Sequence, residues 1–256
     1  MIEQSPRKRA SPAPHSAHVD TSGAAGMQRG FQGRRTLDFL RERLATGYYS
    51  PGDPLPVDAL AAEISVSRQT VLEAMRSLAQ AGLVSIVPQV GCLVAVHTKE
   101  EIGDFFMLFA RVEGLLAGLA ATRHLPSELP RLNSINREID ALLDAPLTES
   151  ERGEQYRLLN QELHGHIHSL ARAPEIATLA KGFWDRTDFH LATAPHASIF
   201  ADRLEIADHE HGAIIRCIVK RDAKGAEKLM LEHILGFRSA TLDARVLSPR
   251  RKKRSA

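Results

Sequence analysis

The stretch that decides the fold runs from residue 57 to residue 96 and reads VDALAAEISVSRQTVLEAMRSLAQAGLVSIVPQVGCLVAV. Its first part has apolar side chains at helical spacing. After a tight turn, Ser67 is a suitable N-cap for a helix that begins at Arg68, and Gly82 is placed to end that helix. Two β-rich runs follow, separated by the turn residues 88–91. The stretch therefore predicts two helices joined by a tight turn, and then a β-hairpin.

Further helices are expected on both sides of this stretch. Leu37, Leu40 and Leu44 recur at helical spacing before it, and the sequence PGDP at residues 51–54 breaks that first helix. From residue 99 to about residue 244 apolar residues recur every third or fourth position, without a strand pattern. The fold predicted is mainly α: an N-terminal winged helix-turn-helix of three helices and a β-hairpin wing, followed by an all-α antiparallel helical bundle. The periodic positions of the bundle are Phe105, Phe109, Val112, Leu115, Leu119, Leu142, Leu159, Leu163, Ile167, Leu170, Ile206, Ile214, Ile218, Leu229, Ile234 and Phe237.

The composition is that of a folded protein, and the length is enough for one large domain or two ordinary ones. Of the 256 residues, 43% are hydrophobic and 25% are charged. We find no apolar run of the about 18 residues that a membrane span needs, so no membrane partner is expected. Cys92 and Cys217 are far apart and cannot form a disulfide framework, which favours a reducing cytoplasm.

Positive charge is concentrated at the two ends of the chain. Residues 1–35 have a net charge of +4 and residues 245–256 a net charge of +6, which leaves −8 between them. We predict a disordered basic arm over 1–32 and a disordered basic tail over 245–256, with the two domains over 33–97 and 98–244. Basic ends on an acidic body suggest a polyanionic partner, although short basic ends can also simply keep a chain in solution.

The helix that begins at Arg68 has one apolar face for packing, and its N-terminus and opposite face are free to enter a DNA major groove. Helix N-termini and small hydroxyl groups suit phosphate, and arginine and glutamine suit base edges. The alternative is a winged helix used only for dimerisation or for binding another protein. The candidate DNA-binding residues, on this helix and on the tip of the wing, are Ser67, Arg68, Gln69, Thr70, Gln89 and Gly91.

This first domain resembles the GntR family of bacterial transcription regulators, which implies double-stranded operator DNA as a partner. Three positions depart from the family pattern: Asp58, Leu72 and Val90 stand where basic residues are usual. Residues 36–97 hold four arginines and six acidic residues, so we expect the basic ends to add phosphate contacts. The resemblance is carried by Pro51, Gly52, Leu55, Leu60, Ala61, Val66, Ser67, Arg68, Val71, Glu73, Ala74, Met75, Leu78, Gly82, Leu83, Val84, Gly91 and Val94.

The predicted bundle has several histidines on its apolar faces. Asn160 and His164 are four residues apart and so emerge from one side of one helix. His211 and His233 each share the apolar stripe of a later helix. Three imidazoles and one oxygen ligand suit Zn²⁺, Ni²⁺ or a similar ion and leave positions open for water or a carboxylate. The alternative is a set of hydrogen-bonded core histidines.

The same residues resemble the metal site of the FadR subfamily, whose C-terminal domain is the FCD domain. The resemblance implies that Asn160, His164, His211 and His233 bind a divalent metal, with zinc expected and nickel or manganese possible. It also implies a homodimer and a small carboxylate metabolite as effector. Among the extra histidines, His168 lies one turn beyond His164 and could replace a ligand, whereas we expect His166 and His209 to be solvated.

Arg111 is a candidate for binding the effector carboxylate, because a guanidinium can grip a carboxylate with two hydrogen bonds. Arg111 and Glu113 resemble a recurrent feature of the FadR subfamily, and an internal ion pair or a solvated face is the alternative. Trp184, Arg186 and His190 are weaker candidates for lining the effector pocket.

We therefore expect a bacterial, cytoplasmic, nucleoid-associated repressor of a metabolic operon, controlled by a small organic acid bound at the metal. A sensor for the metal itself is a second possibility. A metalloenzyme is a third, but no acid stands beside these histidines in a His-Glu-x-x-His arrangement, and a DNA-reading domain has no use in a hydrolase. The chain is not expected to be an enzyme.

Overall fold

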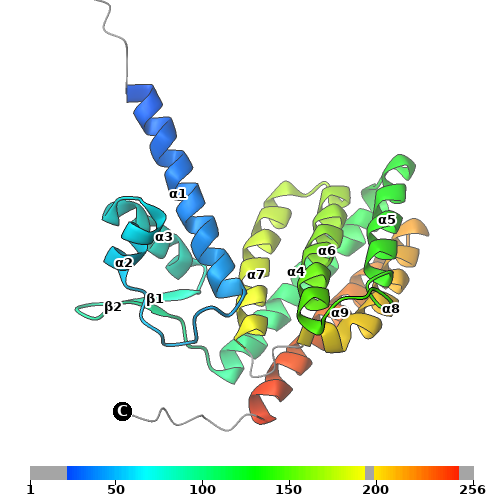
Figure 1. Ribbon diagram of the computed structural model, residues 1–256. Helices are drawn as coiled ribbons and strands as arrows, with labels where there is room; N and C mark the ends of the chain where they lie inside the picture. The colour runs from blue at the N-terminus through cyan, green and yellow to red at the C-terminus, as the bar shows by residue number, and fades with distance from the viewer. Residues whose placement is uncertain (1–21, 194–198, 248–256) are drawn as a thin grey trace, which may run out of the picture.

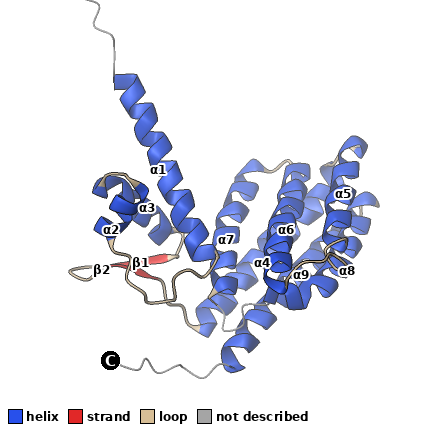
Figure 2. Ribbon diagram, in the orientation of Figure 1, coloured by secondary structure: helices blue, strands red, loops and turns tan. Residues whose placement is uncertain are grey.

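A computed structural model describes residues 22–193 and 199–247 of the chain (Figure 1). Within these ranges it has a small head of helices with one two-stranded sheet, and a larger bundle of helices, which confirms the predicted fold class (Figure 2). The elements are α1 (Ser22–Ala45), α2 (Val57–Ile64), α3 (Arg68–Gln80), β1 (Val84–Val87), β2 (Gly91–Val94), α4 (Lys99–Arg123), η1 (Pro126–Glu128), α5 (Leu129–Asp140), α6 (Glu149–Ala171), α7 (Pro174–Ala192), α8 (Ile199–Val219) and α9 (Ala223–Leu247).

The residues predicted to begin and end the third helix of the head are confirmed. The Ser67 side chain accepts a hydrogen bond from the backbone N–H of Thr70 at 3.1 Å, and α3 begins directly after it. Gly82 follows the end of α3 with a φ of +76°, a left-handed conformation that glycine adopts without strain. β1 and β2 pair antiparallel, with Val84 opposite Val94. The head is thus a winged helix-turn-helix.

Helix α1 begins earlier than expected. The arm predicted to be disordered over 1–32 is helical from Ser22 onward, because alanine, methionine and glutamine favour helix there and no proline occurs between Pro14 and Pro51. At the other end, α9 continues to Leu247, into the expected basic tail. The rest of both predicted ends, 1–21 and 248–256, lies outside the described residues.

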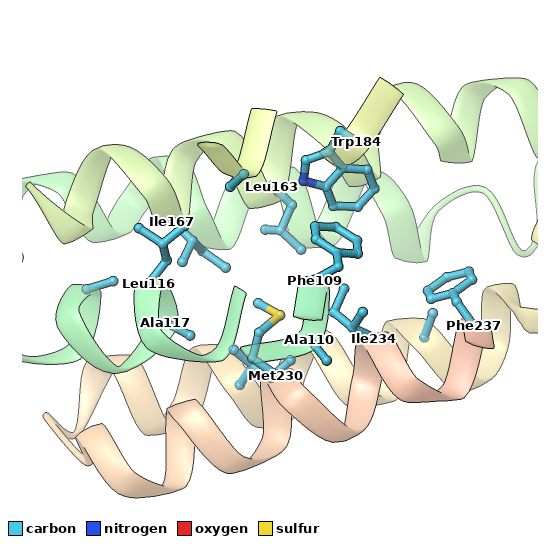
Figure 3. Close-up of a cluster of buried hydrophobic side chains, with 14 of the residues drawn as sticks. Phe109, Ala110, Leu116, Ala117, Leu163, Ile167, Trp184, Met230, Ile234 and Phe237 are labelled. Atoms are coloured by element: carbon cyan, nitrogen blue, oxygen red, sulfur yellow. The ribbon is translucent and has the colours of Figure 1, made fainter. Parts of the chain in front are cut away.

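Helix α4 is the central helix of the bundle. Figure 3 shows its Phe109 and Leu116 packed between Leu163 of α6 and Met230 of α9. Among the described residues α4 is the one helix long and apolar enough to cross a membrane, but 67% of that segment is buried inside the protein, as in a core helix. Leu115, predicted to face inward, is 42% exposed, so it lies off the buried stripe.

Helix α7 joins the head to the bundle. It lies beside α1 in Figure 1, and its Phe189, 1% exposed, belongs to the hydrophobic core of the head. Arg41 of α1 forms an ion pair with Asp185 of α7 at 3.1 Å. A different face of α7 borders the bundle, where Trp184 packs against Phe109 at a ring-centroid distance of 5.3 Å. One helix therefore contacts both cores.

Candidate metal centre and DNA-reading face

Three buried histidines from three helices meet inside the bundle. They are His164 of α6, His211 of α8 and His233 of α9, each at most 1% exposed. One ring nitrogen of each lies within 4.8 Å of those of the other two. The closest pair, His211 Nε2 and His233 Nε2, is 3.2 Å apart. The prediction that these three side chains turn inward is confirmed.

The donor set fits a divalent metal ion. Two nitrogens bound to one tetrahedral zinc ion at its usual bond length lie roughly 3.3 Å apart, close to the separation of His211 and His233. The buried His164 Nε2 has no hydrogen-bond partner among the described residues, so it is available to a metal ion. Burial, with His233 and His164 nearby, holds the pKa of His211 well below its usual value. His211 is therefore neutral, as a metal ligand must be.

Two carboxylates orient these imidazoles from outside the cluster. His164 donates from Nδ1 to Glu113 at 2.8 Å, and His233 donates from Nδ1 to Glu210 at 2.8 Å. A histidine that donates from Nδ1 to a carboxylate leaves Nε2 as the metal-binding nitrogen, and such pairs recur in metal sites. The structure thus directs the Nε2 atoms of His164 and His233 to the same point.

Glu113 is the most heavily hydrogen-bonded group of this region. Besides His164, it accepts from His168 Nε2 at 2.9 Å and from Trp184 Nε1 at 3.1 Å. Burial raises its pKa, but the two histidines outweigh that effect and hold it at about 2, so the carboxylate is ionised. His168 lies outside the cluster of His164, His211 and His233, but with Glu113 and His164 it forms a second buried group of ligand-type side chains, so its role as a replacement ligand stays a prediction.

Asn160 lies one turn before His164 on α6 and is 1% exposed. Its Oδ1 accepts a hydrogen bond from the Tyr156 hydroxyl at 3.4 Å. Asn160, Trp184 and Phe109 line a cavity of about 10 Å³, whose other walls are mostly apolar. Such a volume holds about one water molecule. The predicted fourth ligand therefore lies beside a space that admits a water-sized ligand but no organic acid.

The structure does not bring Arg111 to this site. Its side chain is exposed, whereas Glu113, two residues along the same helix, is buried. Residues two positions apart on an α-helix are separated by about 200° around its axis, so Arg111 and Glu113 cannot both face inward. The sequence left open an ion pair between Arg111 and Glu113. In the structure the Glu113 carboxylate is instead hydrogen-bonded to His164, His168 and Trp184.

The remaining candidates divide between the bundle and the head. Trp184 lines the cavity beside Asn160. Arg186 lies over the ring of Phe105, 4.8 Å from its centroid, away from the histidine cluster. His190 is buried where the head meets the bundle. His209 is exposed as predicted, but the expectation for His166 is wrong: its ring bonds to a backbone carbonyl at 3.1 Å.

The predicted DNA-binding residues of α3 lie on the outer side of the head. Ser67, Arg68 and Gln69 are exposed, and Thr70, which takes part in the N-cap, is half-buried. Arg68 donates from Nε to Asp58 at 3.0 Å, which leaves both terminal nitrogens of its guanidinium free for a base or a phosphate. Asp58, the unusual acid of α2, therefore orients Arg68.

The tip of the wing is also accessible. Gln89 and Gly91 are exposed, and both have positive φ values, +64° and +113°. A side chain at Gly91 would have open space around it, so the need for glycine is conformational. Between them Val90 is 66% exposed, an apolar contact where a basic one was expected from the family pattern.

Comparisons with known proteins agree with this architecture. Residues 33–94 match the family described as bacterial regulatory proteins, gntR family, and residues 104–236 match the FCD domain. The chain is 25% identical over 209 residues to the uncharacterized HTH-type transcriptional regulator YieP of Escherichia coli, covering 74% of this chain and 86% of YieP. It is 21% identical over 211 residues to the E. coli HTH-type transcriptional repressor GlaR, covering 77% of this chain and 90% of GlaR.

Solved structures share the fold. E. coli McbR/YncC superposes with a TM-score of 0.67 at 18% identity, covering 80% of this chain and 94% of that one. A putative GntR regulator from Rhodococcus sp. RHA1 gives a TM-score of 0.62 at 21% identity, covering 82% and 97%. The relatives are transcription regulators rather than enzymes, in agreement with the expectation from the sequence. The chain belongs to the GntR family and is a transcription regulator with an N-terminal winged helix-turn-helix and a C-terminal FCD domain.

Proposed function

We propose that this regulator is a homodimeric repressor that binds operator DNA through α3 and the wing, holds a divalent metal ion in its bundle, and responds to a small carboxylate. Relatives that carry the name repressor support the direction of control. The family resemblance supports the dimer and the class of effector. The observation that carries the proposal is the cluster of His164, His211 and His233, buried and oriented by two carboxylates.

The metal would be held by His164, His211 and His233, with Asn160 as an oxygen ligand, and zinc suits this set best. Nickel and manganese are the alternatives. The ion would supply positive charge close to Glu113 and join three helices of the bundle. Because an asparagine is neutral, we expect weaker binding than an aspartate would give at that position.

Elemental analysis of the purified protein tests the metal centre. We expect about one divalent ion per chain in the wild type and a loss of that ion in His211→Ala. His209→Ala is the matched control, since His209 lies on the same helix but is exposed. Equal metal content in all three proteins, or none in the wild type, would contradict the assignment.

DNA binding is tested by fluorescence anisotropy with the DNA upstream of this protein's own gene, at several salt concentrations. We expect specific binding that weakens in Arg68→Ala, because Arg68 offers its terminal nitrogens to a guanine edge. Binding that is equally weak on unrelated DNA would contradict operator recognition by the head.

A metal sensor is the second candidate, favoured by one observation. The cavity beside Asn160 has about 10 Å³, so it has room for a water molecule but not for an organic acid. In a sensor, removal of the metal alone would change operator affinity. A repressor controlled by a carboxylate would instead respond to the acid while the metal stays bound.

A further inference from the structure

Helix α4 has an apolar outer side that no part of the described chain covers. Its Met107, Leu108 and Leu115 are 50%, 54% and 42% exposed. On the inner side of the same helix, Phe109 and Leu116 pack against α6 and α9 in the middle of the bundle (Figure 3). Several large apolar side chains gathered on one outer face are typical of a surface that binds another molecule.

This gathering sets α4 apart from the other helices of the bundle. Among the described residues, α6 and α7 each have one exposed large apolar side chain. Helix α8 has two, Ile206 and Val219, but they are separated by about 140° around its axis. On α9, Leu231 and Leu235 are half-buried beside α4, where a Cβ atom added at Gly114 would lie 3.6 Å from the Cβ of Leu231. The α4 surface thus consists of Met107, Leu108, Leu115, Leu231 and Leu235.

Two opposite charges lie on the same stripe of α4. Asp104 and Arg111 are exposed, and neither forms an ion pair within 4 Å among the described residues. Seven residues apart on one helix, they are about 10 Å apart along the axis and differ by only about 20° around it. Met107 and Leu108 lie midway between them. The stripe therefore has an acid before its apolar centre and a base after it.

This order makes the stripe complementary to a second copy of itself. In a two-fold interface, every contact occurs twice, with the roles of the two copies exchanged. A two-fold axis beside Met107 and Leu108 sets the two α4 helices antiparallel and places Asp104 of each copy opposite Arg111 of the other. An axis at Arg111 would instead bring two guanidinium groups together, which disfavours association. Charge therefore selects the first register.

We propose that two copies of this chain dimerise through the α4 surface, with Leu108 at the centre and Arg111 of each copy paired with Asp104 of the other. The proposal rests on the proposed function, because it names the surface through which the homodimer forms. It gives Arg111 a role on the outside of the bundle, where the structure places it. The DNA-reading residues belong to the head, so this dimer does not use them.

Sedimentation velocity of the full chain over a range of concentrations measures the Kd of the dimer. We expect the wild type to dimerise. Arg111→Asp leaves each copy with two acidic groups on the stripe, and Asp104→Arg leaves each copy with two basic groups. Either variant alone should raise the Kd roughly tenfold or more, because like charges then face each other in both contacts.

Mixing these two variants gives the sharpest test. In a heterodimer of Arg111→Asp with Asp104→Arg, opposite charges face each other in both contacts. An equimolar mixture should therefore dimerise with a Kd close to that of the wild type, and so should the double variant Asp104→Arg/Arg111→Asp. A variant that had simply failed to fold would not be rescued by mixing.

Leu108→Ala tests the apolar centre separately from the charges. Truncation of a side chain at the centre of an interface should raise the Kd about tenfold. Leu158→Ala is the matched control, because Leu158 is 52% exposed, close to the 54% of Leu108, but it lies on α6 outside the α4 surface. It should dimerise like the wild type.

Three results would overturn the proposal: a monomeric wild type, an equal Kd in the wild type, Arg111→Asp and Leu108→Ala, or no gain on mixing the charge variants. A monomeric wild type would also contradict the homodimer of the proposed function, whereas the other two results would contradict only its surface. Metal content and operator binding of the same preparations are measured in parallel, so failure of the rest of the proposed function is recognised separately.

Discussion

Replacing Phe189 by alanine should detach the DNA-binding head from the bundle. Phe189 belongs to α7, yet it is 1% exposed within the core of the head. Removing a buried phenylalanine side chain costs about 3–5 kcal/mol. That is a large part of the stability of an ordinary domain, about 5–15 kcal/mol. In Phe189→Ala this free energy is lost from the contact between the head and the bundle.

The polar contacts between head and bundle cannot replace this contribution. The ion pair between Arg41 and Asp185 has side chains that are 37% and 30% exposed. Pairs that are open to solvent in this way contribute roughly 0–1 kcal/mol. In Phe189→Ala we therefore expect a head that unfolds on its own at lower denaturant concentration.

Urea denaturation followed by two signals measures this effect. Trp184 fluorescence reports on the bundle, and far-ultraviolet circular dichroism reports on all helices. We expect the two transitions to coincide in the wild type and to separate in Phe189→Ala, with dichroism changing first. Phe183→Ala is the control: Phe183 lies on the same helix but packs on Phe105 and Phe109 of the bundle, so both signals should shift together. Coincident, unshifted transitions in Phe189→Ala would refute the reasoning.

Three other changes test the site, the interface of α6 with α7, and the DNA-reading face. Glu113→Gln should weaken metal binding about 10- to 100-fold in competition with a chelator, because His164 loses its charged hydrogen-bond partner; unchanged affinity would exclude an orienting role. Burial raises the pKa of Asp188 from about 4 to about 7. Because the folded protein binds this proton more tightly than the unfolded chain does, the folded state loses stability as pH rises from about 4 to about 7. The unfolding free energy of the wild type, relative to Asp188→Asn, should therefore fall with pH in that window by at most roughly 1.4 kcal/mol per unit, and a flat difference in urea melts would contradict it. Arg68→Ala should reduce discrimination between operator and mutated operator by about 1–3 kcal/mol in anisotropy titrations, whereas an equal loss on all sequences would assign Arg68 to phosphate.

The head was predictable because its boundaries are encoded locally. The N-cap at Ser67 and the left-handed glycine at Gly82 each act within a few residues, so sequence position alone places them. The inward histidines were predictable for a related reason, since each shares a helical stripe with large apolar neighbours. Apolar spacing does not fix how each helix is rotated about its axis relative to its neighbours. For this reason Leu115 lies outside the buried stripe.

The contacts made by α7 could not be predicted in the same way. Phe189 packs in a core whose other members are more than 90 residues away in sequence, and no periodicity links them. From the sequence, Glu113 was considered only as a partner of Arg111. An acidic residue is usually exposed, even where its position falls on the apolar stripe of a helix. Its partners His168 and Trp184 come from two other helices. Such sites depend on tertiary packing rather than on local pattern.

Helix α7 is placed to act as the coupling element of this regulator. Coupling between two sites requires an element whose position both sites influence. Trp184 gives α7 a hydrogen bond to Glu113 on the metal side, and Phe189 gives it a buried contact in the head. A useful regulatory effect needs only about 1–3 kcal/mol of coupling free energy, less than the buried contact of Phe189 contributes. A ligand that strains a part of this contact would therefore suffice to change operator affinity, without unfolding the head.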